Sequence, residues 1–212
     1  MLSIWFLRHG ETIYTTTHGM CGSGTDAPLS EAGYEMAEQF GDAYREKNWS
    51  AIYCSTMLRA RETVAPLLRG APHVVEYVHD LREIGFGAWE GASERELEKQ
   101  FPIEIGRWND DRDASPPPGG ERATSVRDRG VNVIESIRAS GRDGDILIVS
   151  HKATIRIVLS HYLGLPVSQY HRFLGCPVAS LSVLQFRSRG PLLAHLGDRN
   201  HLSRELQARG DS

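Results

Sequence analysis

Cysteine is scarce in this chain of 212 residues, and the three that occur are Cys21, Cys54 and Cys176. They are odd in number and widely separated, with no CxxC pair and no Cys/His spacing typical of zinc ligands. The sequence therefore predicts neither a disulfide framework nor a zinc site.

Long hydrophobic runs and an excess of one charge are also missing. No segment approaches the ~20 apolar residues of a membrane span, and the first apolar run, residues 2–7, is too short for a secretory signal. Lys and Arg total 24 against 27 for Asp and Glu, giving a net charge of -3. We therefore expect a cytoplasmic protein that binds neither nucleic acid nor membrane, and any anion must be held by locally arranged cations.

The composition and the order of elements favour one α/β domain. Hydrophobic residues make up 40% and charged residues 24%, which are globular proportions. Strands are expected at 2–7, 51–54, 74–78 and 146–149, the first and last of them buried, with a late hairpin at 179–186 and 192–195. Helices are expected after Ser30, after Ser55 or Thr56, and near 94–100, 104–108, 121–140 and 154–163. This alternation predicts a three-layer α/β/α sandwich with a mostly parallel sheet and an antiparallel edge strand.

Two segments lie outside that regular pattern. Residues 85–120 read as a short, cap-like insertion that ends in a Pro/Gly-rich run, within a single domain spanning 1–212. The polar end, 201–212, is expected to fray. The region from 13 to 26 is expected to be a glycine-rich polar loop.

Three of the predicted strands end in residues that suit anion chemistry. The first ends at Arg8-His9, the second leads into Arg59, and the strand at 146–149 ends at Ser150-His151. Because ligands bind beyond the carboxyl ends of parallel strands, two histidines and two arginines should converge there. Helices that begin at this edge would direct N–H groups to the same spot, and arginine forks grip phosphate oxygens in pairs. The pattern predicts a phosphate site.

Ordered motifs across nearly the whole chain carry a family resemblance. An Arg-His-Gly tripeptide alone is a weak signal, but several blocks in a fixed order are specific. The blocks are LRHGET at 7–12, PLSEAG at 28–33, STMLRARET at 55–63, LREIG at 81–85, WEG at 89–91, PPGGE at 117–121 and VSH at 149–151. On these the chain resembles the histidine phosphatase superfamily, which implies a phosphoglycerate mutase-like fold.

The resemblance implies a role for five side chains. His9 would be the nucleophile that becomes phosphorylated, Arg8 and Arg59 would clamp the phosphoryl oxygens, and His151 would donate a further hydrogen bond. Glu83 matches the proton donor to the leaving oxygen. Phosphoryl transfer needs an in-line nucleophile and fixed positive charge, so the resemblance implies no metal and no other cofactor.

The implied chemistry sets protonation states. His9 must attack as the neutral imidazole, which the charges of Arg8 and Arg59 favour, whereas His151 helps most when protonated by a bound phosphate. Glu83 must hold a proton near neutral pH. We therefore expect an activity optimum at neutral to acidic pH.

Three positions depart from the family pattern and are candidate substrate contacts. Thr15 stands where many members carry Asn, Cys21 where a polar contact is common, and Lys152 where glycine is common. The segment 16–22 also lacks the usual arginine, which weakens recognition of a second anionic group. The backbone N–H of Lys152 can still serve a phosphate.

Other polar and aromatic residues have simpler interpretations. Glu90 and Glu11 are carboxylates that compete with Glu83 for the acid role, although Glu11 is more plausibly an orienting group for His9 or a helix cap. Trp89 and Trp108 are expected to pack within the insertion. The remaining histidines share no spacing and are expected at the surface.

The leading hypothesis is a phosphomonoesterase for small or medium phosphate esters, working through a phosphohistidine. The first alternative is a cofactor-dependent phosphoglycerate mutase, which needs extra cations in a closed pocket. The second is a non-catalytic phosphate-binding regulatory module, which would have no need for Glu83. The late hairpin offers an edge strand on which a homodimer could form.

Overall fold

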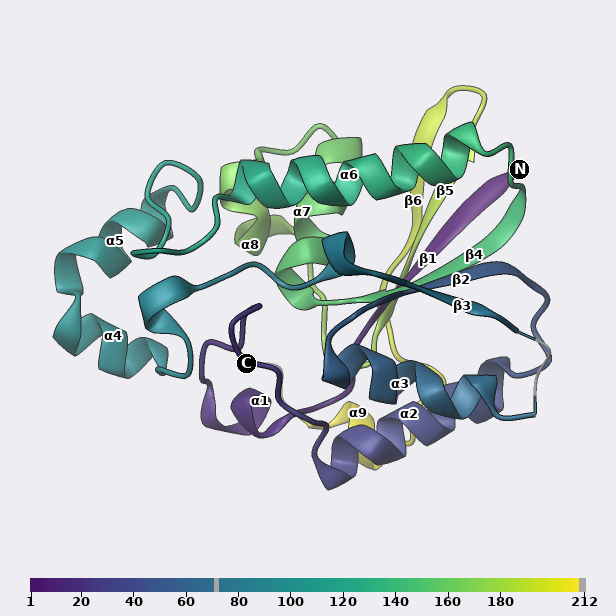
Figure 1. Ribbon diagram of the computed structural model, residues 1–212, viewed down its shortest axis with the longest axis horizontal. Helices are drawn as coiled ribbons and strands as arrows, with labels where there is room; N and C mark the ends of the chain where they lie inside the picture. The colour runs from purple at the N-terminus through teal and green to yellow at the C-terminus, as the bar shows by residue number, and fades with distance from the viewer. Residues whose placement is uncertain (71–72, 210–212) are drawn as a thin grey trace.

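The computed structural model describes residues 1–70 and 73–209 and shows a twisted six-stranded sheet between two layers of helices (Figure 1). The strand order is β3-β2-β4-β1-β5-β6. β1 pairs in parallel with β4, β2 with both β4 and β3, while β5 is antiparallel to β1 and to β6. The strands are β1 (Leu2–Arg8), β2 (Trp49–Ser55), β3 (Val75–Val78), β4 (Gly144–Ser150), β5 (Leu181–Arg187) and β6 (Gly190–Asp198). The predicted fold class is confirmed.

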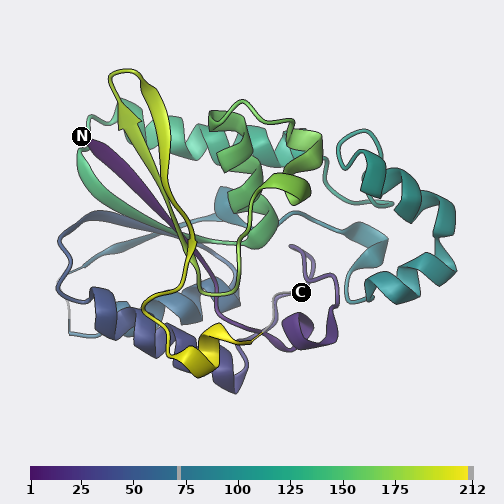
Figure 2. The ribbon, with the colours of Figure 1, turned by 180° about the vertical axis from the view of Figure 1, so that it is seen from behind.

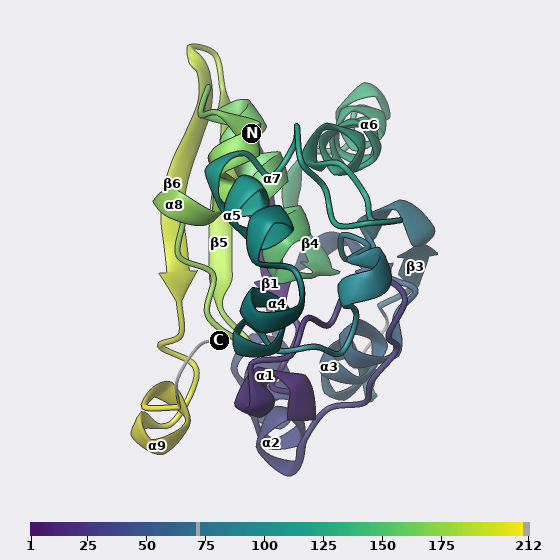
Figure 3. The ribbon, with the colours of Figure 1, turned by 90° about the vertical axis from the view of Figure 1, so that its left-hand side faces the viewer.

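No helix in the described part of the chain is long and apolar enough to cross a membrane. The helices divide between the two faces of the sheet. The longer ones are α2 (Glu31–Tyr44) and α3 (Leu58–Leu68) on one face, and α6 (Ala123–Ala139) and α7 (Lys152–Tyr162) on the other (Figure 3). The shorter ones are α1 (Ile13–Thr17), η1 (His79–Leu81), η2 (Gly87–Trp89), α4 (Glu94–Gln100), α5 (Pro102–Asp110), η3 (Val167–Gln169), α8 (Tyr170–Phe173) and α9 (Arg204–Gln207).

The central strand β4 shows why both faces are covered. Ile146 and Ile148 belong to the hydrophobic cluster that contains the apolar residues of α6 and α7. Leu147 and Val149 belong to the cluster formed with α2 and α3. Successive side chains of a strand point to opposite faces, so an uninterrupted apolar run is buried on both sides.

The register of the parallel strands brings their carboxyl ends together. Arg8 pairs with Ser150, and Cys54 pairs with Val149, so β1, β4 and β2 end at the same edge. The residues that follow these strands, including His9 and His151, therefore emerge side by side.

The insertion at 85–120 has a hydrophobic core of its own. Trp89 and Trp108 are almost fully buried, with ring centroids 5.6 Å apart in an edge-to-face arrangement. The same cluster includes Val126 of α6 and Ile157 of α7, which joins the insertion to the main body. α4 and α5 project beyond the sheet (Figure 1). The prediction that both tryptophans pack here is confirmed.

The late hairpin is confirmed, and Figure 2 shows β5 and β6 rising together along one side of the sheet. Two local predictions are wrong. The segment 13–26 contains the short helix α1, whose start is fixed when the Thr12 N–H donates to Thr15 Oγ1 over 3.2 Å. Neither Ser55 nor Thr56 caps α3, because Met57 occupies the N-cap position without a side-chain hydrogen bond.

The chain end is ordered where a frayed segment was expected. Leu202 and Leu206, which flank and form α9, are buried against Met36 and Val178. The prediction was wrong for 201–209 because two leucines one turn apart pack against the apolar surface formed by Met36 and Val178. Residues 210–212 lie outside the described residues.

Candidate active site

The residues at the strand ends meet as predicted. The ring centroids of His9 and His151 are 5.2 Å apart. Arg59, in the first turn of α3, places its Nε 3.2 Å from Nδ1 of His151. Arg59 and His151 are fully buried and His9 is 6% exposed. The topology thus assembles one compact group from three segments of the chain.

The backbone fixes the tautomer of His9. Its Nδ1 lies 2.8 Å from the carbonyl oxygen of Gly10, which can only accept a hydrogen bond. Nδ1 therefore carries the proton and Nε2 carries the lone pair. The main chain of His9 is also anchored, because its N–H donates to the Ser150 carbonyl and its own carbonyl accepts from Ala179.

Glycine at position 10 is required by close packing. A Cβ there would lie 2.7 Å from the carbonyl oxygen of Gly33, where α2 approaches the loop after β1. The Gly10 N–H donates to Thr63 Oγ1 over 3.0 Å. These contacts explain physically why a glycine follows the histidine in the first motif.

His151 has the opposite tautomer. The Nε–H of Arg59 donates to Nδ1, so the ring proton is on Nε2, which lies 2.8 Å from Ser55 Oγ. Both ring nitrogens thus have partners within the protein. Sequence reasoning treated Ser55 as a helix cap and missed this contact.

Burial and positive charge hold both imidazoles neutral. Burial, then Arg59, then Arg8 lower the pKa of His9 well below its usual value. The pKa of His151 is lowered in the same way, by burial first and then by Arg59 and His9. This lowering agrees with the neutral state expected for His9. Protonation of His151 requires an anion that offsets these effects.

Arg59 also binds the loop that precedes Leu29. Its Nη1 donates to the Thr25 carbonyl over 2.8 Å, and Nη2 lies 3.2 Å from the carbonyls of Cys21 and Gly22. Glu90 holds the other side of this loop, accepting from the N–H of Gly22 over 2.9 Å and from Thr25 Oγ1 over 2.8 Å. Glu90 therefore organises the loop and does not line the active-site cavity.

Glu83 sits at the N-terminus of α7. Its Oε1 accepts from the N–H of Ile84 over 2.9 Å, and from the N–H and hydroxyl of Thr154, each over 3.1 Å. Its Oε2 accepts from the N–H of Ala153 over 3.1 Å. The N–H groups of Ala153 and Thr154 at the start of α7 thus bind this carboxylate and not a phosphate, which corrects the expectation for these two groups, while the role of the Lys152 N–H stays a prediction.

The start of α3 is occupied as well, because the Leu58 N–H donates to Asp26 Oδ1 over 2.7 Å. Glu11, expected to orient His9 or cap a helix, accepts from the hydroxyl of Ser30 at the N-terminus of α2 and pairs with Arg209. Its carboxylate contacts Ser30 and Arg209, so these bonds do not support the expected role toward His9.

A cavity of about 350 Å³ opens beside these residues. Arg8, His9 and Glu83 line it, whereas Arg59 and His151 do not. The candidate contacts that also line the cavity are Thr15, Cys21 and Lys152. The volume is in the range of small-molecule sites. The described residues contain no group of three or more His, Cys, Asp or Glu placed to hold a metal ion.

Sequence reasoning missed two arginines and a histidine that also line the cavity. They are Arg112, Arg156 and His171, which come from the insertion, α7 and α8. Burial first, and then the neighbouring arginines, lower the pKa of His171 to about 4, so the two arginines supply the positive charge. The guanidinium of Arg112 lies 3.6 Å from the centroid of the Trp108 ring. These residues are far apart in sequence and belong to no shared motif, so only the fold brings them together.

The comparisons with known proteins agree with this geometry. The family model of the histidine phosphatase superfamily (branch 1) matches residues 4–199. The chain therefore belongs to this superfamily, and the resemblance drawn from its motifs is confirmed.

Curated relatives and solved structures match along nearly their full length. The adenosylcobalamin/alpha-ribazole phosphatase of Escherichia coli is 25% identical over 89% of this chain and 98% of its own. Phosphoserine phosphatase 1 of Hydrogenobacter thermophilus is 26% identical over 95% of each chain. The Bacillus stearothermophilus YhfR structure has a TM-score of 0.87 at 26% identity, covering 95% of this chain and 99% of that one. The protein is a hydrolase, a phosphatase of this superfamily.

Proposed function

We propose that the protein hydrolyses phosphate monoesters in two displacements at His9. In the first, the lone pair of Nε2 attacks phosphorus, the bond from phosphorus to the ester oxygen breaks, and Glu83 gives that oxygen a proton. In the second, water attacks the phosphohistidine, Glu83 takes the proton, and the N–P bond breaks. The products are an alcohol and inorganic phosphate, and the enzyme is regenerated.

The observation that carries this proposal is the state of His9. Its ring is neutral, its proton is held on Nδ1 by the Gly10 carbonyl, and it lines the same cavity as Arg8 and Glu83. A nucleophile, a cation and a carboxyl group thus share one space of substrate size. A regulatory module would need the cation but not the carboxyl group.

The groups that stabilise negative charge differ in their distance from the substrate: Arg8 lines the cavity, whereas Arg59 and His151 do not. Arg8 lines the cavity and is proposed to contact the phosphoryl oxygens directly. Arg59 and His151 lie outside the lining, and they are proposed to stabilise the developing negative charge from behind His9. His151 reaches a phosphoryl oxygen when its Nε2–H leaves Ser55 Oγ, which a bound phosphate would favour.

The direct test is hydrolysis of p-nitrophenyl phosphate in EDTA. The wild type should release nitrophenol, and His9→Ala should lose more than about 10³-fold in kcat while remaining folded. His195→Ala, which removes an exposed histidine of β6, is the matched control and should be unchanged. Unaltered hydrolysis in His9→Ala would exclude the proposed nucleophile.

The cations that line the cavity besides Arg8 favour an ester that carries a second anionic group. They are Lys152, Arg112 and Arg156. Relatives include a phosphoserine phosphatase and the glucosyl-3-phosphoglycerate phosphatase of Mycolicibacterium vanbaalenii, 29% identical over 77% of this chain and 75% of its own. Phosphate release from a panel of metabolite phosphates, with and without a carboxylate, tests this class.

The same cations would serve a mutase, so that activity is tested separately. Isomerisation of 3-phosphoglycerate in the presence of 2,3-bisphosphoglycerate would indicate a mutase. Release of free phosphate without isomerisation supports the phosphatase.

We also propose that residues 1–212 form one domain with 85–120 as its cap, because the insertion shares a hydrophobic core with α6 and α7. We propose that this domain is cytoplasmic.

β6 is proposed as the site of a homodimer contact. It is the outermost strand on its side of the sheet and exposes Leu192 and Leu196. An unpaired strand edge with apolar side chains is a template for pairing with a second copy. Light scattering after size exclusion gives the mass that tests this.

A further inference from the structure

We propose that Arg129 is a positioning residue for the proton donor: by clamping the segment 80–85, it holds the Glu83 carboxyl group where it can deliver the proton. This inference rests on the proposed role of Glu83. Arg129 is on α6, outside the catalytic group and absent from the cavity lining.

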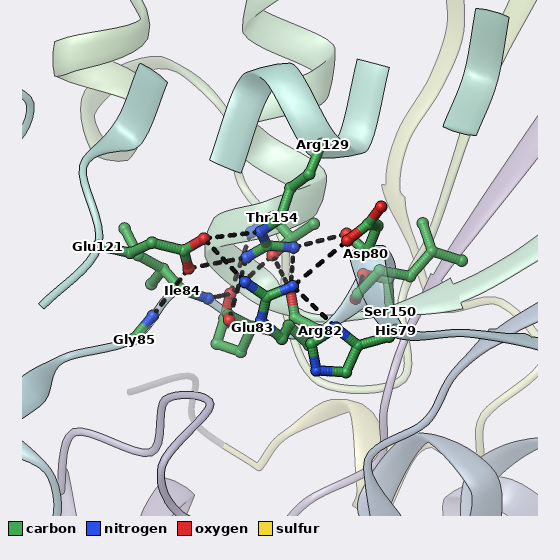
Figure 4. Close-up of polar contacts among 11 residues, drawn as sticks. His79, Asp80, Arg82, Glu83, Ile84, Gly85, Glu121, Arg129, Ser150 and Thr154 are labelled. Atoms are coloured by element: carbon green, nitrogen blue, oxygen red, sulfur yellow. Dashed lines mark hydrogen bonds and ion pairs between the residues drawn. The ribbon is translucent and has the colours of Figure 1, made fainter. Parts of the chain in front are cut away.

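The guanidinium of Arg129 binds three carbonyl oxygens of one short segment (Figure 4). Nη1 donates to the carbonyls of Asp80 over 2.6 Å and Arg82 over 2.7 Å. Nη2 donates to the carbonyl of Glu83 itself over 3.1 Å. Arg129 is only 8% exposed, so these bonds are shielded from water. The main chain of the proton donor is thus held from the side of α6.

Glu121 completes the clamp. Its two oxygens accept from Nε and Nη2 of Arg129 over 2.9 and 3.0 Å, and it also accepts from the Gly85 N–H over 3.2 Å. Burial alone would raise the pKa of Glu121, but the hydrogen bonds and charge of Arg129 reverse this and lower it. The pair is therefore ionic, and it grips the segment on both sides of Glu83.

The side chain of Glu83 is held by a second element. α7 supplies the N–H groups of Ala153 and Thr154, and the Thr154 hydroxyl lies within hydrogen-bond distance of both Glu83 Oε1 and the Arg82 carbonyl. Backbone and carboxyl group are thus anchored to two different helices. A shift of the backbone relative to α7 would break this arrangement.

Both oxygens of the Glu83 carboxyl group are held. Oε1 accepts from the N–H groups of Ile84 and Thr154, and Oε2 accepts from the N–H of Ala153. The contacts of Arg129 with the backbone and of α7 with the carboxyl group together set where the transferable proton lies.

A purely structural role for Arg129 would give a different pattern of rates across substrates. Loss of a structural contact lowers the rate equally for all substrates. A misplaced proton donor slows only those substrates whose leaving group needs the proton. Phenyl phosphate needs it, because phenolate is a poor leaving group, whereas 2,4-dinitrophenolate leaves without it. The ratio of kcat/KM for these two esters therefore separates the roles.

The experiment measures kcat/KM, which reports the first displacement, for four variants with both esters. Glu83→Gln should lose about 10²- to 10⁴-fold on phenyl phosphate and far less on the dinitrophenyl ester. Arg129→Met should show the same selectivity at about 10- to 100-fold. Arg129→Lys, which keeps the charge, should show it more weakly. Arg127→Met is the matched control on α6, since Arg127 forms an ion pair with the exposed Asp128.

The double variant Arg129→Met/Glu83→Gln gives the decisive result. If Arg129 acts through Glu83, the double variant should be no slower on phenyl phosphate than Glu83→Gln alone. Full additivity, or an equal loss on both esters for Arg129→Met, overturns the inference. If Arg129→Met does not fold by circular dichroism, Arg129→Lys takes its place, and an equal loss there overturns it.

The outcome also separates this inference from the proposed function. Selectivity in Glu83→Gln without selectivity in the Arg129 variants rejects only the positioning role. The absence of selectivity in Glu83→Gln rejects Glu83 as the proton donor, and the inference with it.

Discussion

The Nε–H of Arg59 donates to Nδ1 of His151 over 3.2 Å, which links a helix on one side of the sheet to the histidine after the central strand. This single bond sets the tautomer of His151. It also places a permanent positive charge beside two buried imidazoles, of which His9 is the proposed nucleophile. Arg59 thus lowers the pKa of both histidines and also supplies a permanent positive charge.

Replacing Arg59 should therefore change the titration of both histidines. In Arg59→Met the pKa of His9 and of His151 should rise, because a neighbouring cation is lost, but both should stay below 6.5, since burial is the larger cause. NMR of the labelled imidazole nitrogens measures this. We also expect kcat/KM to fall about 10²- to 10³-fold.

Arg61→Met, on the exposed side of α3, is the control for that experiment. It should leave both the titration and kcat/KM unchanged. Equal titration curves for the wild type and Arg59→Met would contradict the electrostatic role.

Glu90 should matter for the order of the loop that Arg59 binds. Its carboxylate accepts four donors, the N–H groups of Gly22, Gly24 and Phe86 and the hydroxyl of Thr25. Glu90→Gln presents an NH₂ group to some of them, and we expect a loss of about 1–3 kcal/mol in unfolding free energy. Denaturant titration measures the loss, with the exposed Glu98→Gln as the control. An unchanged midpoint in Glu90→Gln would refute the loop contact.

Stability should fall on the acid side because His9 and His151 are buried and neutral. Their pKa values are lowered from 6.5 on folding, so below about pH 6.5 the unfolded chain binds protons that the folded chain does not. The unfolding free energy should then decrease by up to about 1.4 kcal/mol per pH unit for each histidine. His201, whose pKa burial lowers to about 4, adds to the effect.

Denaturant titrations from pH 7.5 to 5.5 test this sign. His151→Gln should flatten the pH dependence, whereas the exposed His195→Gln should not. If the unfolding free energy changes with pH by the same amount in the wild type and in His151→Gln, His151 is protonated in the folded protein.

The sequence predicted the parts of the fold that local patterns determine. The run Ile146–Val149 is apolar at every position, which requires burial on both faces, and it forms the central strand. Because parallel strands end at one edge, the convergence of His9, Arg59 and His151 followed from the order of elements. The motif glycine Gly10 is explained by its contact with Gly33.

The features that sequence reasoning missed depend on contacts between distant segments. The N–H groups at the start of α7 bind Glu83, 70 and 71 positions away, and Arg129 binds carbonyls up to 49 positions away. No periodicity or motif spacing encodes such pairs. Arg112 likewise stands alone in a polar segment and gains its place in the cavity only through the packing of the insertion.

The most direct test of the account is the site of phosphorylation. The enzyme is mixed with a phosphate monoester, quenched in alkali within one turnover, digested, and examined by mass spectrometry. The account predicts an acid-labile phosphoryl group on Nε2 of His9, absent in His9→Ala. Turnover with no phosphorylated intermediate, or with the phosphoryl group on another residue, would contradict it.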